Sequence, residues 1–217
     1  MNAIKRICRA LEVRVMFMVS RIVIFFNGNL EYEPFEHEYN CGRKSRRMTE
    51  RGLEIFLARK TIEKWGGTTR CIEVGAVTPY YFPGEISDIL DFWDKHELVN
   101  HHKDIFDFDY TGYNVISIST IEHVGRDEYA GAPKQVGNSV DALNKILNEC
   151  AHCLITWPIG YNQMLDRYAA ENNIEGLACY KRGKFDNDWR ICLDMKKAFA
   201  TEYSHLRWAD AIAVIER

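Results

Sequence analysis

Two short apolar runs decide the predicted fold: RCIEVG at residues 70–75 and NVISIS at residues 114–119. Both are rich in β-branched side chains and both end in a small residue, which is typical of a buried strand that stops at a turn. Further runs of this kind occupy residues 86–93, 99–105, 153–157, 177–181 and 209–215, and a helical pattern fills 140–147. This alternation predicts an α/β domain with a doubly wound, mostly parallel seven-stranded sheet and helices on both faces.

The composition fits one globular domain with an appended arm. The chain has 217 residues, of which 47% are hydrophobic and 27% are charged, so it can bury a core. The 28 basic and 31 acidic residues give a formal net charge of −3, which argues against a nucleic-acid partner. We assign residues 1–38 to an N-terminal basic amphipathic arm and hairpin, and residues 39–217 to the main domain.

Residues 1–26 form the basic amphipathic part of this arm. They carry five basic residues against one acidic residue, Glu12, and their apolar residues recur at helical spacing. Such a segment either makes peripheral contact with an anionic membrane surface, or is a first helix that packs on the domain or on a second copy in a homodimer. Arg14 and Arg21 interrupt the most apolar stretch, so we expect no transmembrane helix.

The seven cysteines indicate a reducing, cytoplasmic environment. Their number is odd and their spacing irregular, whereas a secreted disulfide framework would favour an even set in a shorter chain. Cys150 and Cys153 form a single CxxC pair at the point where a helix is expected to run into a buried strand. Without a second pair, we interpret these two thiols as small apolar core residues and expect no metal site.

We expect the chemistry at the carboxyl ends of the strands, because ligands of doubly wound sheets bind there. A carboxylate can accept both hydroxyls of a ribose, and a glycine lets a ligand approach the backbone closely. Asp91 is the alternative to Asp94 at the second strand. The acidic, hydroxyl-bearing, imidazole and small residues at these ends are Glu73, Gly75, Asp94, Asp104, Ser117, Ser119, Glu122 and His123.

The turn after the first strand argues against a dinucleotide. Residues 75–79 do not form a GxGxxG motif, and Pro79 removes a backbone donor where a pyrophosphate would be held. A cationic ligand without phosphate needs no such donors. S-adenosylmethionine is one such ligand, and a nicotinamide oxidoreductase ranks lowest among the alternatives.

Several short motifs follow one another along residues 39–217: YN at 39–40, ER at 50–51, CIEVG at 71–75, VISISTIEHVG at 115–125 and PIGYN at 158–162. Together with Asp94 and Asp104, their order resembles that of class I S-adenosylmethionine-dependent methyltransferases. The resemblance is closer to a subgroup of small bacterial methyltransferase-like proteins. It implies a Rossmann-like sheet, S-adenosyl-L-methionine as cofactor and methyl transfer as the activity.

The resemblance also implies a role for each matching residue. The acid of the first strand would lie near the methionine amino group, and the glycine beneath the cofactor. The two aspartates would hold the ribose and face the adenine amine, in that order, and the two serines would line the methionine end. The residues implied to bind the cofactor are thus Glu73, Gly75, Asp94, Asp104, Ser117 and Ser119.

On the acceptor side, His123 is the candidate base for a hydroxyl acceptor, with Glu122 as the alternative. Tyr161 and Asn162 follow the fifth strand and can present a hydroxyl and an amide to a polar acceptor. The resemblance to this family suggests a small-molecule, sugar-like or glycan-type acceptor that is methylated at oxygen.

Two other functions remain open at this point. One is an inactive binding or scaffold protein that keeps the fold without turnover. The other is a nucleic-acid methyltransferase that uses the basic residues 43–51 as a phosphate clamp. The second ranks lower, because the Asn/Asp-Pro-Pro-aromatic motif for base amines is missing from the sequence.

Overall fold

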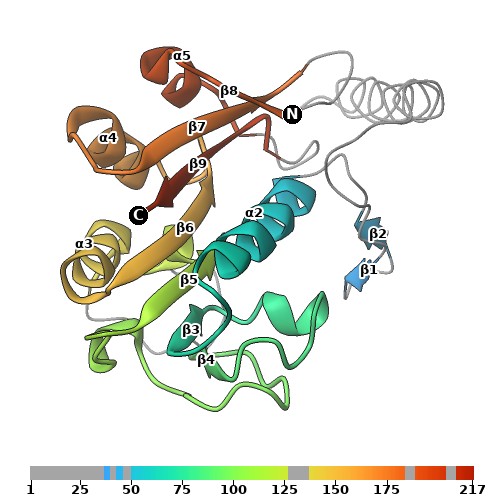
Figure 1. Cartoon of the computed structure of the whole chain (residues 1–217). Helices are drawn as coiled ribbons and strands as arrows, with labels where there is room; N and C mark the ends of the chain where they lie inside the picture. Colours follow the sequence, from blue (N-terminus) through green and yellow to red (C-terminus); the bar gives the residue numbers. More distant parts are fainter. Residues whose placement is uncertain (1–36, 40–42, 46–49, 127–136, 184–188, 204–208) are drawn as a thin grey trace.

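The structure is a computed structural model, and it describes residues 37–39, 43–45, 50–126, 137–183, 189–203 and 209–217 (Figure 1). Its centre is a seven-stranded sheet in the order β4-β3-β5-β6-β9-β7-β8. The strands are β3 (Cys71–Val74), β4 (Asp88–Leu90), β5 (Asn114–Ile118), β6 (His152–Pro158), β7 (Leu177–Arg182), β8 (Trp189–Ile191) and β9 (Ala211–Glu216).

The direction of the strands corrects the predicted fold. The pairings β3–β4, β3–β5 and β5–β6 are parallel, whereas β6–β9, β7–β9 and β7–β8 are antiparallel. The sheet is therefore mixed, and the prediction of a Rossmann-like, mostly parallel doubly wound sheet is wrong. A continuous apolar run indicates that a strand is buried on both faces, but it does not indicate whether the strand runs parallel or antiparallel to its neighbours.

The first half of the sheet also lacks the alternation of strands with helices that we predicted. Within residues 75–113, which the structure describes throughout, the connections hold only the short 3₁₀ turns η1 (Thr78–Tyr80) and η2 (Ile105–Asp107). The predicted strand at 99–105 is reduced to one isolated bridge between Leu90 and His101.

The helices cover both faces of the sheet (Figure 1). Helix α2 (Glu50–Lys64) packs on one face through Leu53, Ile55, Ala58 and Ile62. The other face carries α3 (Ser139–Glu149), α4 (Gln163–Glu171) and α5 (Met195–Phe199). Residues of each strand alternate between the two apolar clusters, as the period of a strand requires.

Polar caps explain where the helices on the second face begin. The Asn138 side chain accepts the N–H groups of Val140 and Asp141, and the Asp141 carboxylate accepts the Asn138 N–H, which makes a complete capping box. Asn162 and Asp194 cap α4 and α5 in the simpler way, with one side-chain oxygen each.

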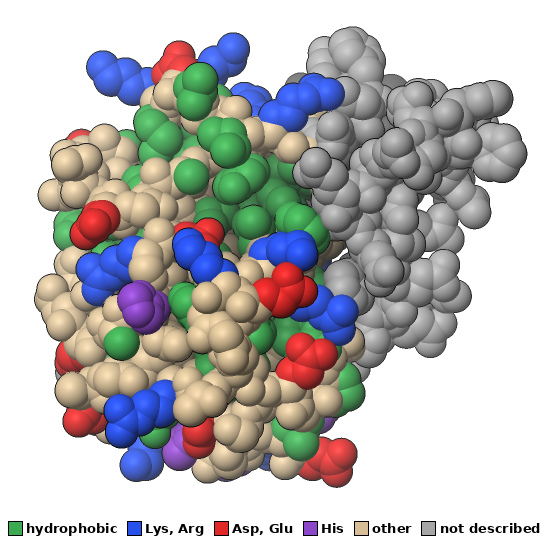
Figure 2. Space-filling model, in the orientation of Figure 1, with side chains coloured by type: hydrophobic (Ala, Val, Ile, Leu, Met, Phe, Trp, Pro, Cys, Tyr) green, Lys and Arg blue, Asp and Glu red, His purple; other side chains and the backbone are tan. Residues whose placement is uncertain are grey.

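A separate two-stranded antiparallel sheet joins β1 (His37–Tyr39) and β2 (Arg43–Ser45). The predicted basic segment 1–26 lies outside the described residues. Among the residues that are described, no helix is both long enough and apolar enough to cross a membrane. On the face drawn in Figure 2, acidic and basic side chains are interspersed around a group of hydrophobic ones.

Candidate functional site

The candidate site lies at the edge of the sheet where the four parallel strands end. Since β3, β4, β5 and β6 run in the same direction, the segments that leave them meet at one edge. The Gly75 N–H after β3 donates to the Leu90 carbonyl of β4 at 2.8 Å. The Ser119 N–H after β5 donates to the Thr156 carbonyl of β6 at 3.0 Å. Residues from four separate stretches of sequence are therefore neighbours here.

Glu73 organises the turn that follows β3. Its side chain is fully buried, and its carboxylate accepts the N–H groups of Val77 at 3.0 Å and Thr78 at 2.7 Å as well as the Thr78 hydroxyl. Burial raises the pKa of Glu73 to about 7, although these hydrogen bonds and the charge of Arg51 act in the opposite direction. The backbone donors that a phosphate would need are thus already bonded to a side chain of the protein itself.

Gly75 faces a side chain of the protein at close range. Its φ is +89°, and a Cβ placed on it would lie 2.0 Å from Thr120 Oγ1. Only glycine fits this backbone conformation and this contact. The predicted place of Gly75 beneath a cofactor stays a prediction. What lies against Gly75 in this structure is Thr120.

Asp91 and Asp94 both lie in the turn after β4, with different partners. Asp91 accepts the N–H groups of Ala76 at 3.0 Å, Trp93 at 2.7 Å and Asp94 at 2.7 Å, so it ties the end of β4 to the turn after β3. Asp94 accepts the Tyr80 hydroxyl at 2.9 Å and the His96 N–H at 2.8 Å. Asp91 is therefore the carboxylate that joins the ends of β3 and β4, whereas Asp94 lies three residues later in the turn after β4.

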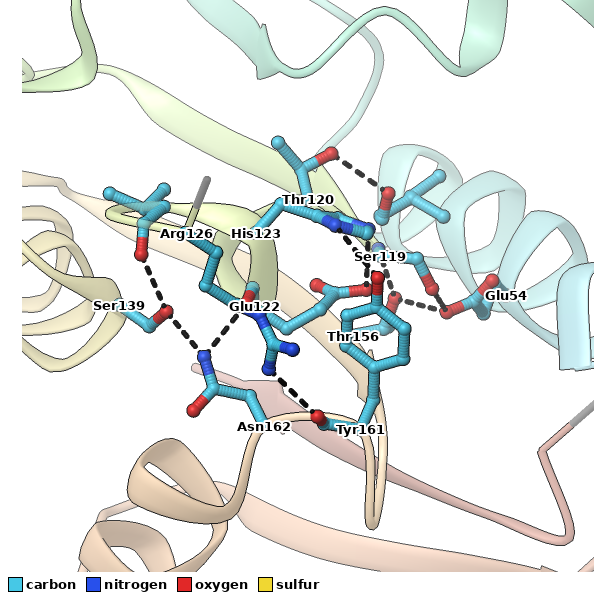
Figure 3. Close-up of polar contacts among 12 residues, drawn as sticks. Glu54, Ser119, Thr120, Glu122, His123, Arg126, Ser139, Thr156, Tyr161 and Asn162 are labelled. Carbon is cyan, nitrogen blue, oxygen red and sulfur yellow. Dashed lines mark hydrogen bonds and ion pairs between the residues drawn. The ribbon is translucent and has the colours of Figure 1, made fainter. Parts of the chain in front are cut away.

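Glu54 joins the exits of β5 and β6 to helix α2, as Figure 3 shows. Its Oε1 accepts the Ser119 hydroxyl at 2.6 Å and the Thr156 hydroxyl at 2.8 Å, and the side chain is fully buried. Its Oε2 lies 3.6 Å from Arg51. Ser119 has a φ of +43°, which is uncommon for a residue other than glycine, and the bond to Glu54 helps to hold it there.

Glu122, His123 and Tyr161 form a chain of polar groups beside Glu54 (Figure 3). The short turn η3 (Ile121–His123) carries the first two. One imidazole nitrogen of His123, Nε2, lies 3.6 Å from Glu122 Oε1, and the other, Nδ1, lies 3.3 Å from the Tyr161 hydroxyl. Glu122 is buried, while about a quarter of the His123 side chain is exposed, at 27%. The imidazole therefore lies between a buried carboxylate and a phenol.

Aromatic rings enclose the exposed side of this chain. Tyr161 packs edge-to-face on Tyr203, and the Arg126 guanidinium lies over the Tyr161 ring at 5.0 Å. Burial raises the pKa of Tyr203 to about 12, and the carboxylates of Glu50, Glu122 and Glu54 contribute to the rise. The surroundings of the site are thus rich in carboxyl groups.

Asn162 is a structural residue in this arrangement. Its amide nitrogen donates to the Glu122 carbonyl and to the Ser139 hydroxyl, both at 2.7 Å, and its oxygen accepts the Leu165 N–H at the start of α4. Every group of this amide is therefore used inside the protein. Its place as an acceptor contact stays a prediction.

The remaining two candidates lie apart from this cluster. Asp104 accepts the Phe106 N–H at 3.1 Å and caps the turn η2. Ser117 is fully buried on β5, and its hydroxyl has no hydrogen-bond partner among the residues that the structure describes. Within the same residues, no group of three or more His, Cys, Asp or Glu side chains is arranged to hold a metal ion.

The reasoning from sequence missed Glu54 and Thr156. Thr156 lies in the strand predicted at 153–157, where a hydroxyl among apolar residues was a usable signal. Glu54 lies near the start of α2, next to Leu53 and Ile55, and its full burial could not be read from the sequence, because acidic residues are common at the surface near a helix N-terminus.

We compared the chain with protein-family models, curated protein sequences and solved structures. Neither a protein-family model, nor a curated protein sequence, nor a solved structure matches this chain.

Proposed function

We propose that this protein is a methyltransferase that uses S-adenosyl-L-methionine and acts on a hydroxyl of a small, sugar-like acceptor. The observation that carries the proposal is an excess of buried carboxylates at the shared strand edge. Glu54, Glu73 and Glu122 are each 1% exposed or less; Arg51 lies 3.6 Å from Glu54 Oε2, and His123 Nε2 lies 3.6 Å from Glu122 Oε1. A cationic ligand would offset this charge, whereas a phosphate would add to it.

The charge and the hydrogen-bonding groups of these residues match those of S-adenosyl-L-methionine. The sulfonium and ammonium groups of the cofactor are cations, and the carboxylates provide the complementary charge. The Asp94 carboxylate is partly exposed and keeps acceptor capacity for ribose hydroxyls beyond its two bonded partners.

The cofactor would supply an activated methyl group. The protein would bind and orient the cofactor and the acceptor, and it would remove a proton from the acceptor hydroxyl. His123, oriented by Glu122, would accept the proton of the acceptor hydroxyl. The Tyr161 hydroxyl at 3.3 Å from His123 Nδ1 stands where an acceptor hydroxyl would come, so it marks the acceptor side of the site. The aromatic rings of Tyr161 and Tyr203 would form a wall against which a sugar ring can pack.

A second function is favoured by a different observation, the closed turn after β3. Glu73 and Asp91 together accept five backbone N–H groups, and Thr120 covers Gly75. A turn that satisfies its own donors has little need of a ligand. This supports an inactive binding or scaffold protein in which this turn holds no ligand.

Calorimetric titration with S-adenosylmethionine and its demethylated product separates the two functions. We expect binding of both compounds, and no binding of a nicotinamide dinucleotide, which carries the same adenosine with phosphates. Asp94→Ala should weaken binding at least about tenfold, since two charged hydrogen bonds to ribose are lost. Absence of heat with both compounds would overturn the proposal and favour the binding protein.

The matched variant is Asp91→Ala. It removes the carboxylate that ties the two turns together, so its thermal stability must be measured beside its affinity. Loss of binding in a stably folded Asp91→Ala variant, with normal binding by Asp94→Ala, would move the ribose site to Asp91. Loss in Asp94→Ala alone would keep it at Asp94.

A further inference from the structure

The two edges of the seven-stranded sheet are finished in different ways. Strand β4 forms one edge and β8 forms the other (Figure 1). The outer side of β4 is covered by the segment that follows it. The N–H groups of Asn100 and His101 donate to the Ile89 carbonyl at 3.2 and 3.0 Å, and the Asn100 side chain accepts the Ile89 N–H at 2.9 Å. The Asp91 N–H donates to the His101 carbonyl at 3.1 Å, so this edge is closed by the chain itself.

The outer side of β8 has no such cover from the residues that the structure describes. The Cys192 N–H donates inward, to the Cys179 carbonyl of β7, at 2.7 Å. Successive residues of an antiparallel strand point their backbone groups to opposite sides, so those of Trp189, Ile191 and Leu193 point away from β7. No strand of the described ranges pairs with them. This edge therefore presents a row of open hydrogen-bond donors and acceptors.

Two apolar side chains lie on this open edge. Ile191 is 59% exposed and Leu193 is 93% exposed, which makes them the most exposed large hydrophobic side chains in the described part of the chain. They belong to the same face of the sheet, because they are two residues apart. Proteins commonly protect an edge strand with charged side chains or prolines at such positions. An open apolar edge is instead typical of a strand that pairs with another strand.

We propose that β8 pairs antiparallel with β8 of a second copy of this chain, around a two-fold axis at Ile191, and joins the two sheets into one. In this register Ile191 lies opposite Ile191 of the second copy, and Leu193 lies opposite Trp189 of the second copy. The cross-strand pairs on this face are then apolar, and the outward backbone groups of these residues bond to one another. The dimer is independent of the proposed methyl transfer.

The sequence of the edge favours a second copy as the partner. A symmetric interface needs a strand that is complementary to itself, and the order Trp189, Ile191, Leu193 stays apolar when it is reversed. Arg190 and Asp194 belong to the other face and are both exposed. The register places Arg190 diagonally across from Asp194 of the second copy, and the symmetry repeats this pair of opposite charges.

Sedimentation of the full-length protein tests the dimer. We expect a mass of about twice 25.3 kDa. Ile191→Lys should raise the dissociation constant of the dimer at least about 100-fold, because two lysines would face each other across the axis. Trp93→Lys is the matched control, since Trp93 is also exposed, at 39%, but follows β4 at the closed edge. A monomeric wild type, or a dimer that Trp93→Lys dissociates and Ile191→Lys does not, would overturn the proposal.

Cysteine cross-linking tests the register without relying on a destabilised variant. Ile191→Cys, in a Cys192→Ser background, should form a covalent dimer on mild oxidation, because the paired Cα atoms would lie about 5.5 Å apart. Leu193→Cys in the same background is the control. Its two copies would be four residues apart along the strands, at about 13 Å, and should not cross-link. Cross-linking at residue 193 equal to that at 191, or none at 191, would contradict the pairing.

Discussion

The two ends of the candidate site satisfy their carboxylates in different ways. After β3 and β4, Glu73 and Asp91 accept backbone N–H groups from the turns next to them. After β5 and β6, Glu54 comes from a helix distant in sequence and accepts the side-chain hydroxyls of Ser119 and Thr156. The first end is a turn held by its own backbone. The second is a network of side chains from separate elements.

This difference separates shape from chemistry. A carboxylate bonded to several backbone N–H groups cannot leave them without reshaping the turn, so the β3–β4 end has a fixed form. Hydroxyls, an imidazole and a phenol can exchange partners by rotating, so the β5–β6 end can take up a proton or an acceptor. We therefore expect substitutions at the first end to change stability most, and substitutions at the second end to change turnover most.

Gly75→Ala should have the largest effect on stability. The new Cβ would lie 2.0 Å from Thr120 Oγ1, at a φ of +89°. Overpacking and backbone strain together should cost about 3–5 kcal/mol in the free energy of unfolding, measured by urea denaturation. Gly84→Ala is the matched control, because its φ is +81° but nothing lies within 4 Å of the new Cβ. It should cost only about 1–2 kcal/mol. Equal costs at the two glycines would show that the contact with Thr120 is unimportant.

The pH dependence of stability should come next. Because the pKa of Glu73 is raised from 4.5 to about 7, the folded protein binds this proton more tightly than the unfolded chain does. The stability that this group contributes is complete below about pH 4.5 and is lost as the pH rises to about 7, a decline of about 3 kcal/mol. Glu73→Gln resembles the protonated acid and should flatten the decline between pH 5 and 8. The exposed control Glu63→Gln should leave the decline unchanged. A wild-type curve that rises across this range would contradict the raised pKa.

Asn162→Ala tests a residue that begins α4 and also contacts the segment after β5. It removes the cap of α4 and leaves the Ser139 hydroxyl without this donor, which should cost about 2 kcal/mol in thermal or urea unfolding. If Asn162 contacts an acceptor, turnover should fall further than this loss of stability explains. Asn172→Ala, at the other end of the same helix and on an exposed bond, is the control and should cost less than about 1 kcal/mol.

His123→Gln should have the smallest effect on stability and the largest on turnover. The side chain is partly exposed, so we expect less than about 1 kcal/mol in unfolding. If His123 is the base, formation of the demethylated cofactor with sugar acceptors should fall at least about 100-fold, with unchanged cofactor affinity. The control His101→Gln, which removes a hydrogen bond with Asp88 away from these residues, should keep full turnover. Normal turnover in His123→Gln would assign the base to another group.

Local patterns in the sequence predicted the strands better than their arrangement. Residues 71–74, 114–118 and 152–158 are strands close to the predicted positions, because apolar β-branched runs bounded by turn residues are a local signal. The reversal of β9 depends on which strands it pairs with, and no local pattern carries that information. The absence of α-helices between β3 and β5 has a related cause, since the turn there is held by Glu73 and Asp91 rather than by helical hydrogen bonds.

The sequence predicted that the site lies at the strand ends, but it did not predict which side-chain contacts join those ends. Ser119, Glu122, His123 and Tyr161 do lie together, because the ends of β5 and β6 are neighbours. Asp104 lies outside the cluster, since a turn separates it from β5. Glu54 was beyond reach, because its contacts join residues 65 and 102 positions apart in the chain.

The position of β9 has a consequence for the order in which the protein can assemble. This strand is made last among the described elements, yet it lies between β6 and β7 in the interior of the sheet. While the ribosome is still synthesising the chain, β6 and β7 have no strand between them, and two rows of backbone hydrogen-bonding groups remain open. The nascent chain therefore has exposed strand edges until residues 211–216 emerge, and these edges are the sites at which chaperones or aggregation would compete with folding.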